Sequence, residues 1–145
     1  MTASASAMIE ALGLAPHPEG GWYRETWRSG TALPNGRACA TSILFLLEAG
    51  RRSHWHRVDA GELWLFQAGA PLQLGVAEAG RAAETVTIGP DPLAGQSPQH
   101  LVPPGAWQSA RACAGGWTLV ACVVAPGFEF AGFELAPPGW APPGA

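Results

Sequence analysis

Glycine and proline interrupt this sequence so often that most of it can form only short elements. The 145 residues include 19 Gly and 14 Pro. One stretch, Ser6–Leu12, has a helical pattern, with a serine as candidate N-cap and Gly13 after its end. Many short apolar segments with turn residues between them are typical of an all-β sandwich or barrel. The expected strands are Trp22–Trp27, Thr41–Leu47, Glu62–Gln67, Leu72–Ala77, Thr85–Ile88, His100–Val102, Trp107–Ala112 and Trp117–Val124. About eight strands suit a double-sheet jelly roll.

Length and composition limit the classes of protein to which the chain can belong. We expect a single domain over residues 1–137, followed by a Pro/Gly-rich tail over residues 138–145. The chain has no apolar run of the roughly 18 residues that a membrane helix needs, and its first residues lack the pattern of a signal peptide. We therefore expect a cytoplasmic protein without a membrane partner.

The charged residues argue against a nucleic-acid partner. The net charge is −3, and all eight basic residues are arginines that form no basic run. Because lysine is absent, Schiff-base chemistry on a lysine side chain is excluded. The three cysteines, Cys39, Cys113 and Cys122, are odd in number and show no C-x-x-C spacing, so we expect free thiols.

The polar pattern richest in chemistry is His54-Trp55-His56 with Glu62 after a turn-like segment. Side chains two apart on a strand point to the same face, so both imidazoles can converge on one point. Two imidazoles and a carboxylate suit a divalent Fe, Mn, Ni or Zn ion with open positions. A polar pocket without a metal is the alternative explanation of the same pattern.

The surrounding motifs resemble those of the cupin superfamily. The stretch from Gly50 to Gly69 looks like the first cupin motif, and Pro103–Gln108 looks like the second. Three further segments resemble one cupin subfamily of unknown function: LGLAPHPEGGWYRETWRS, SHWHRVDAGELW with AGAPL, and VAPGFEFAGFEL. The resemblance implies a double-stranded β-helix (jelly-roll cupin barrel) with a short N-terminal helix, related to sugar-nucleotide epimerases. It also implies a homodimer whose subunits pair through their sheets.

The sequence departs from the general cupin pattern at its metal ligands. The spacers around His54, His56 and Glu62 differ in length, and Gln108 stands where the fourth ligand is usually histidine. An amide oxygen is a weaker ligand than imidazole for first-row metals. The resemblance therefore implies a metal set of His54, His56, Glu62 and Gln108, with three ligands better supported than four.

The expected pocket combines these groups with aromatic and basic neighbours. We expect His54, His56 and Glu62 to be catalytic, and a small-molecule ligand to be bound by Arg24, Tyr23, Trp64, Gln108 and Trp55. Only one of Tyr23 and Arg24 is expected to face the pocket. The loop His17–Gly21 precedes the first expected strand, and its His17 and Glu19 could equally touch a substrate or form a structural turn.

Three functions remain open from the sequence. The first is an epimerase- or isomerase-like enzyme acting on a sugar-like or other polar metabolite, with a histidine as general base. The single tyrosine, Tyr23, does not lie on a late strand, where the tyrosine of barrel epimerases lies, so that mechanism does not transfer residue by residue. The second is a metal-dependent oxygenase or isomerase that uses His54, His56 and Glu62. The third is a non-catalytic module that binds or senses a small ligand.

Overall fold

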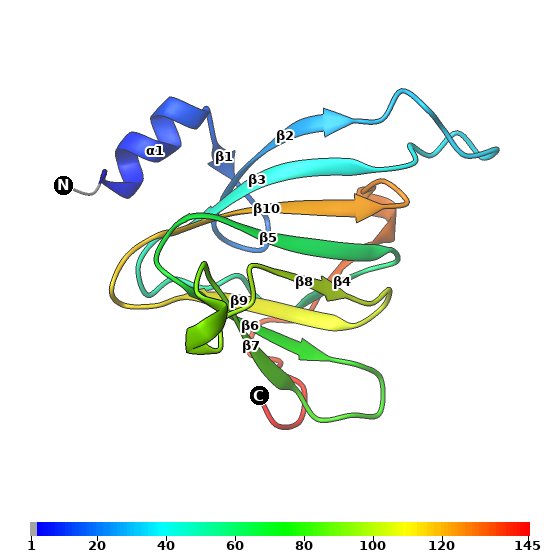
Figure 1. The fold of residues 1–145 in the computed structure, drawn as a ribbon. Helices are drawn as coiled ribbons and strands as arrows, with labels where there is room; N and C mark the ends of the chain where they lie inside the picture. The colour runs from blue at the N-terminus through cyan, green and yellow to red at the C-terminus, as the bar shows by residue number, and fades with distance from the viewer. Residues whose placement is uncertain (1–2) are drawn as a thin grey trace.

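Two antiparallel β-sheets form most of the structure, a computed structural model that describes residues 3–145 (Figure 1). The first sheet has six strands in the order β1-β2-β3-β10-β5-β8, and the second has five in the order β11-β4-β9-β6-β7. The elements are α1 (Ala5–Leu12), β1 (Ala15–Pro16), β2 (Trp22–Arg28), β3 (Thr41–Leu47), β4 (His56–Val58), β5 (Gly61–Gly69), β6 (Leu72–Ala77), β7 (Glu84–Ile88), the 3₁₀ turn η1 (Pro92–Ala94), β8 (Gln99–Val102), β9 (Trp107–Ala112), β10 (Thr118–Ala125), the 3₁₀ turn η2 (Phe130–Gly132) and β11 (Phe133–Leu135). The predicted all-β jelly roll with a short N-terminal helix is confirmed.

The core lies between the two sheets and follows the alternation of the strands. In β9 the buried residues alternate with more exposed ones, as expected for strands with one face toward the core. Strand β3 departs from this pattern, because Phe45, Leu46 and Leu47 are all buried. Phe45 and Leu47 belong to the central core, whereas Leu46 points outward and packs with the residues of α1. Helix α1 therefore covers one part of the outer face of the six-stranded sheet.

The chain enters and leaves helix α1 as its sequence predicts, with a shift of one residue. The helix begins at Ala5, and its N-cap Ser4 accepts a hydrogen bond from the backbone N–H of Ala7 at 3.1 Å. Gly13 ends the helix in the left-handed conformation, with φ of 64°. No helix within residues 3–145 is both long enough and apolar enough to cross a membrane.

The Pro/Gly-rich C-terminal tail lies against the second sheet. The backbone N–H of Ala83 donates to the carbonyl of Pro143 at 2.8 Å. Trp140 packs on Trp107 of β9, with ring centroids 4.7 Å apart. Backbone pairing and aromatic packing together hold the tail against the barrel.

Candidate functional site

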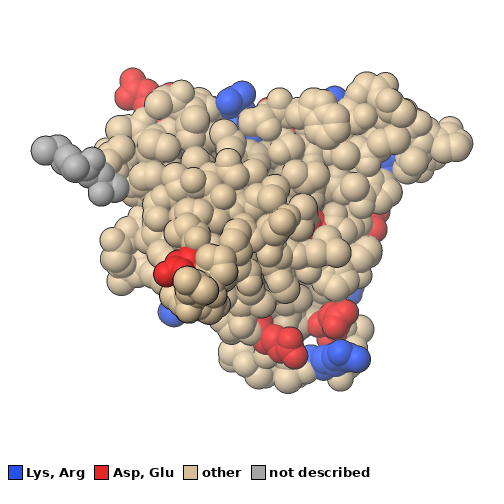
Figure 2. All heavy atoms as spheres, viewed as in Figure 1, with Lys and Arg blue, Asp and Glu red and all other residues tan. Residues whose placement is uncertain are grey.

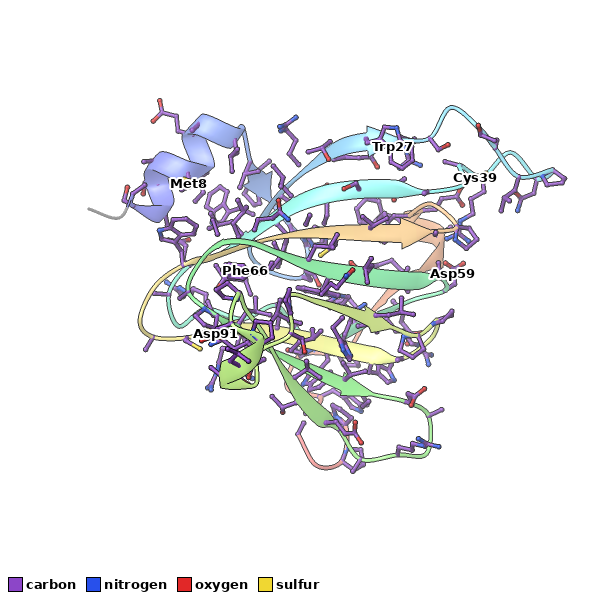
Figure 3. The ribbon with its side chains drawn as sticks, viewed as in Figure 1. Met8, Trp27, Cys39, Asp59, Phe66 and Asp91 are labelled. Carbon is purple, nitrogen blue, oxygen red and sulfur yellow. The ribbon has the colours of Figure 1, made fainter. Side chains whose placement is uncertain are left out.

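A cavity of about 450 Å³ lies between the sheets, beside the ends of several strands. Its walls come from the loop before β2, from β2 to β5, from β10 and from the segment that follows β10. In Figure 3, Asp59 marks the turn between β4 and β5 at this end of the barrel. The lining residues are His17, Glu19, Tyr23, Glu25, Arg28, Thr41, Ile43, His56, Val58, Glu62, Cys122, Val124, Phe128, Glu129, Phe130 and Phe133.

The loop His17–Gly21 is fixed against the barrel and carries Glu19 into the cavity. The backbone N–H of His17 donates to the Gly21 carbonyl at 2.9 Å, and the N–H of His54 donates to the Glu19 carbonyl at 2.7 Å. Gly21 has φ of 81°, and a Cβ atom there would come within 2.7 Å of the Phe45 ring. A side chain at this position would therefore push the loop away from the core.

His56 and Glu19 form a buried ion pair at the cavity wall. The distance from His56 Nδ1 to Glu19 Oε2 is 2.6 Å, and His56 and Glu19 are only 2% and 8% exposed. Oε2 accepts no hydrogen bond of good geometry, so charge attraction dominates the contact. Burial by itself would lower the pKa of His56, but the charges of Glu19 and Glu62 raise this pKa to about 9. His56 is consequently an imidazolium at neutral pH.

His17 lies on the other side of Glu19 and is neutral. Its Nδ1 accepts a hydrogen bond from the backbone N–H of Glu19 at 3.1 Å, which leaves no proton on that nitrogen. Burial lowers the pKa of His17, and the positive charge of His56 lowers it further, against the opposing effect of Glu19. The ring of Tyr23 lies edge-on to His17 with centroids 4.5 Å apart.

Glu62 ends a chain of buried hydrogen bonds. The indole N–H of Trp64 donates to Oε1 of Gln108 at 2.8 Å, which fixes the orientation of the Gln108 amide. The Nε2 of Gln108 then donates to Oε1 of Glu62, also at 2.8 Å. Burial raises the pKa of Glu62, whereas the nearby charge of His56 lowers it. Such a carboxyl can exchange a proton nearer to neutral pH than an exposed one can.

Cys122 also lines this cavity, but as a neutral thiol. Burial raises its pKa well above the usual value, and the carboxylates of Glu62 and Glu19 raise it further. A nucleophilic cysteine needs a lowered pKa, so Cys122 has the wrong environment for that role.

The structure brings some of the predicted site residues together and separates others. His56, Glu62 and Tyr23 line the cavity, and Trp64 and Gln108 are connected to it through Glu62. The remaining three predicted residues lie elsewhere. The ring of His54 is bonded to the Pro137 carbonyl, Arg24 donates to the Leu12 carbonyl, and Trp55 lines a separate groove over the five-stranded sheet.

The expected strand parity of His54 and His56 is wrong because strand β4 begins only at His56. His54 precedes the strand, where the alternation of side chains does not apply. Sequence reasoning left open the role of Glu19 and did not single out Glu25, Arg28, Phe128 or Glu129 as pocket residues. The polar residues of the loop His17–Gly21 could have indicated a role for Glu19, but the sequence does not predict the backbone hydrogen bond between Glu19 and His54.

The predicted metal ligands do not fit a metal ion in this arrangement. Within residues 3–145, no group of three or more His, Cys, Asp or Glu side chains is placed to hold one. The ring of His54 is bonded to the Pro137 carbonyl and does not line the cavity, so one of the two predicted imidazole ligands is absent from it. The amide nitrogen of Gln108, which is no ligand, points to Glu62.

The sequence of most of the chain matches a known family. Residues 6–136 match the family described as Cupin superfamily (DUF985), and the chain belongs to this family. A Shewanella oneidensis protein of known crystal structure is similar, with 41% identity, 93% of this chain and 85% of that chain covered, and a TM-score of 0.88. A hypothetical protein from Leishmania major is also similar, with 33% identity and a TM-score of 0.86, and the match covers 92% of this chain and 88% of the Leishmania chain.

More distant neighbours share the fold alone. A variant of oxalate decarboxylase from Bacillus subtilis has 16% identity and a TM-score of 0.63, with 83% of this chain and 29% of that chain covered. That decarboxylase contains Mn(II) centres. No curated protein matches this sequence.

Proposed function

We propose that the protein is an isomerase of the epimerase type that moves a proton on a small polar metabolite without a metal. The supporting observation is the buried His56–Glu19 ion pair in the cavity that Glu62 also lines. Glu19 holds His56 protonated, and burial raises the pKa of the Glu62 carboxyl above its ordinary value. An acid and a base of different strength in one cavity are what proton transfer at carbon requires.

The proposed reaction is proton removal beside a carbonyl group. The Glu62 carboxylate takes a proton from the carbon next to the substrate carbonyl, and the electron pair of the broken C–H bond moves onto the carbonyl oxygen. His56 stabilises this oxygen by donating from Nε2, a nitrogen that takes part in no hydrogen bond among the described residues. Return of the proton to the other face of the same carbon completes an epimerisation. Where that carbon bears a hydroxyl group, transfer of the hydroxyl proton to the former carbonyl oxygen and return of the carbon proton to the former carbonyl carbon complete an isomerisation.

Deuterium uptake from heavy water tests this reaction without knowledge of the natural substrate. We expect the protein to exchange a carbon-bound hydrogen in members of a panel of ketoses, aldoses and other polar carbonyl compounds, as read by NMR. Glu62→Gln should slow this exchange by about 10²- to 10⁴-fold, the usual contribution of a general base. Glu10→Gln, on exposed helix α1, is the matched control and should leave it unchanged.

Three results would contradict the proposal. Exchange that survives Glu62→Gln would remove Glu62 from the reaction, and exchange abolished by a chelator would establish a metal-dependent one. Ligand binding without exchange in any compound would favour a non-catalytic binding module.

We also propose that the protein is a homodimer that pairs through the outer face of the six-stranded sheet. Outward-facing Leu63 of β5 pairs in register with Leu101 of β8 and with Val123 of β10, and Leu101 is 57% exposed. Contiguous exposed apolar residues on a sheet are typical of an interface. Leu101→Glu should convert the dimer into a monomer in light scattering, with Leu93→Glu on exposed η1 as control. A monomeric wild-type protein would refute the proposal.

A further inference from the structure

We infer that the cavity accepts uncharged or amino-bearing ligands and rejects ligands that carry phosphate or carboxylate groups. The inference rests on the proposed function, because it specifies the chemical class of the substrate of that same cavity. It concerns the charge of the groups that enter the cavity, and it therefore can be tested by binding alone.

The charged groups of the lining carry more negative than positive charge. Four carboxylate side chains, those of Glu19, Glu25, Glu62 and Glu129, face two cationic side chains, those of Arg28 and His56. His17, the remaining titratable nitrogen base, is held neutral by its hydrogen bond from the Glu19 backbone. A cleft lined by an excess of one sign of charge concentrates ligands of the opposite sign and repels those of the same sign.

Each cation of the lining already has a carboxylate partner. Arg28 binds Glu25 through two nitrogens, with distances of 3.2 Å from Nε to Oε2 and 2.6 Å from Nη2 to Oε1. Its Nη2 also donates to the Phe128 carbonyl at 3.2 Å. An anionic ligand would have to displace one of these partners and leave a carboxylate unpaired.

The other arginines near the cavity are also occupied. Arg37 holds Asp59 through two nitrogens, at 2.7 and 3.1 Å, and donates to the Gly127 carbonyl at 2.7 Å. Arg24, which the sequence offered as an anion-binding residue, donates to the Leu12 carbonyl at 2.7 Å and does not line the cavity. The cavity thus offers no spare cation among the described residues.

Glu62 and Glu129 bring to the cavity two carboxyl groups that favour a ligand with donors. Glu62 is only 7% exposed, its Oε1 accepts from Gln108, and the Cys122 thiol lies next to its carboxyl group. Neither Glu62 nor Glu129 takes part in an ion pair within residues 3–145. Hydroxyl and ammonium groups can satisfy such oxygens, but phosphate and carboxylate groups cannot.

Part of the cavity lining is aromatic, which suits the same ligands. Phe128, Phe130 and Phe133 pack together with ring centroids 5.0 to 6.0 Å apart and all line the cavity. Aromatic faces attract cations and the C–H groups of uncharged rings, and they repel anions. The carboxylates and the aromatic rings of the lining therefore favour the same charge class.

The test uses three hexoses that differ in charge: glucosamine, glucose and glucose 6-phosphate. Binding is followed through the imidazole NMR signals of His17 and His56, which line the cavity. We expect glucosamine and glucose to shift these signals with dissociation constants at least about tenfold below that of glucose 6-phosphate, a free-energy difference that one charge contact can supply. The inference would be overturned if glucose 6-phosphate bound as tightly as glucose. It would also be overturned if all three hexoses shifted the imidazole signals equally, or if none of them did.

A single variant should weaken the discrimination against the anionic ligand. Glu25→Gln removes the carboxylate that occupies Arg28, so glucose 6-phosphate should bind about tenfold more tightly than to the wild type. Glu10→Gln removes the same charge on remote α1 and should leave the affinity unchanged. An unchanged affinity in Glu25→Gln would show that Arg28 pairing does not control anion binding and would overturn this step.

The inference and the proposed function fail separately. Selective binding of glucosamine and glucose without deuterium exchange in any compound would refute the proposed reaction and leave the charge preference standing. Exchange on an anionic compound that binds tightly would refute the charge preference and leave the reaction standing.

Discussion

Replacing Glu19 by Gln should abolish the fall in stability with rising pH that His56 contributes. His56 has a pKa of about 9 in the folded protein against an ordinary value of 6.5. A difference of that size corresponds to about 3 kcal/mol, since one pKa unit is about 1.4 kcal/mol. Because the pKa is raised on folding, this stabilisation is fully present below pH 6.5 and is lost as the pH rises through about 9.

The magnitude can be measured by urea unfolding at several pH values. In the wild type, the free energy of unfolding should fall by about 2 kcal/mol between about pH 6.5 and about pH 8.5 through His56 alone. In Glu19→Gln the largest opposing charge is gone, and burial then lowers the pKa of His56. This variant should therefore lose the fall with pH.

The variant must be compared with a protein that lacks a different carboxylate. Glu10→Gln, on an exposed face of α1, should retain the wild-type slope. The Cys122 thiol stays protonated in the folded protein over this range, because burial raises its pKa well above the usual value. The reasoning would be refuted if the free energy of unfolding fell with pH equally in Glu19→Gln and in the wild type. It would also be refuted if NMR showed the His56 ring of the wild type titrating at or below pH 6.5.

Two further substitutions test the loop and the buried hydrogen-bond chain. Gly21→Ala should lower the free energy of unfolding in urea by about 2 to 4 kcal/mol, because φ of 81° is strained for alanine and its Cβ meets the Phe45 ring. Gly80 has φ of 76° and no atom near its Cβ position, so Gly80→Ala should lose only the stability that the strained backbone costs. Equal losses of unfolding free energy in Gly21→Ala and Gly80→Ala would contradict the contact between the Cβ at position 21 and the Phe45 ring. Gln108→Leu should destabilise by about 2 to 4 kcal/mol by leaving an indole N–H and a carboxyl unpaired. In the wild type the hydrogen bond from Gln108 stabilises the ionised form of Glu62, so its loss in Gln108→Leu should raise the pKa of Glu62, as measured by carboxyl NMR. An unchanged pKa of Glu62 would argue against that hydrogen bond.

The strands were predictable because turn residues separate them and because strands such as β9 bury alternate residues. Thr41–Leu47 and Leu72–Ala77 were expected with the bounds that the structure has. The short strand β11 was not expected, since three residues carry too little pattern, and the strand expected to hold both His54 and His56 is the short β4, which begins only at His56. The two strands pair with each other, between His56–Val58 and Phe133–Leu135, and this contact joins segments far apart in the chain.

The candidate site was predictable only where a strand fixes the direction of a side chain. Glu62 and Trp64 lie on one face of β5, as alternation requires, and both are buried. His54 did not follow because no strand extends to it, and its backbone N–H instead holds the loop at Glu19. The partner that sets the charge of His56 thus arrives through a tertiary contact that the local sequence does not encode.

The placement of Glu19 on a loop has a consequence for how this protein can change over evolution or by design. Glu19 reaches His56 from outside the named strands, and its backbone link to the barrel uses a carbonyl that any residue possesses. The sheets can therefore persist while the residue at this one loop position alters the protonation of the histidine beneath it. Within this chain, the scaffold and the acid–base tuning of its cavity are encoded by separate segments, and each can vary without rebuilding the other.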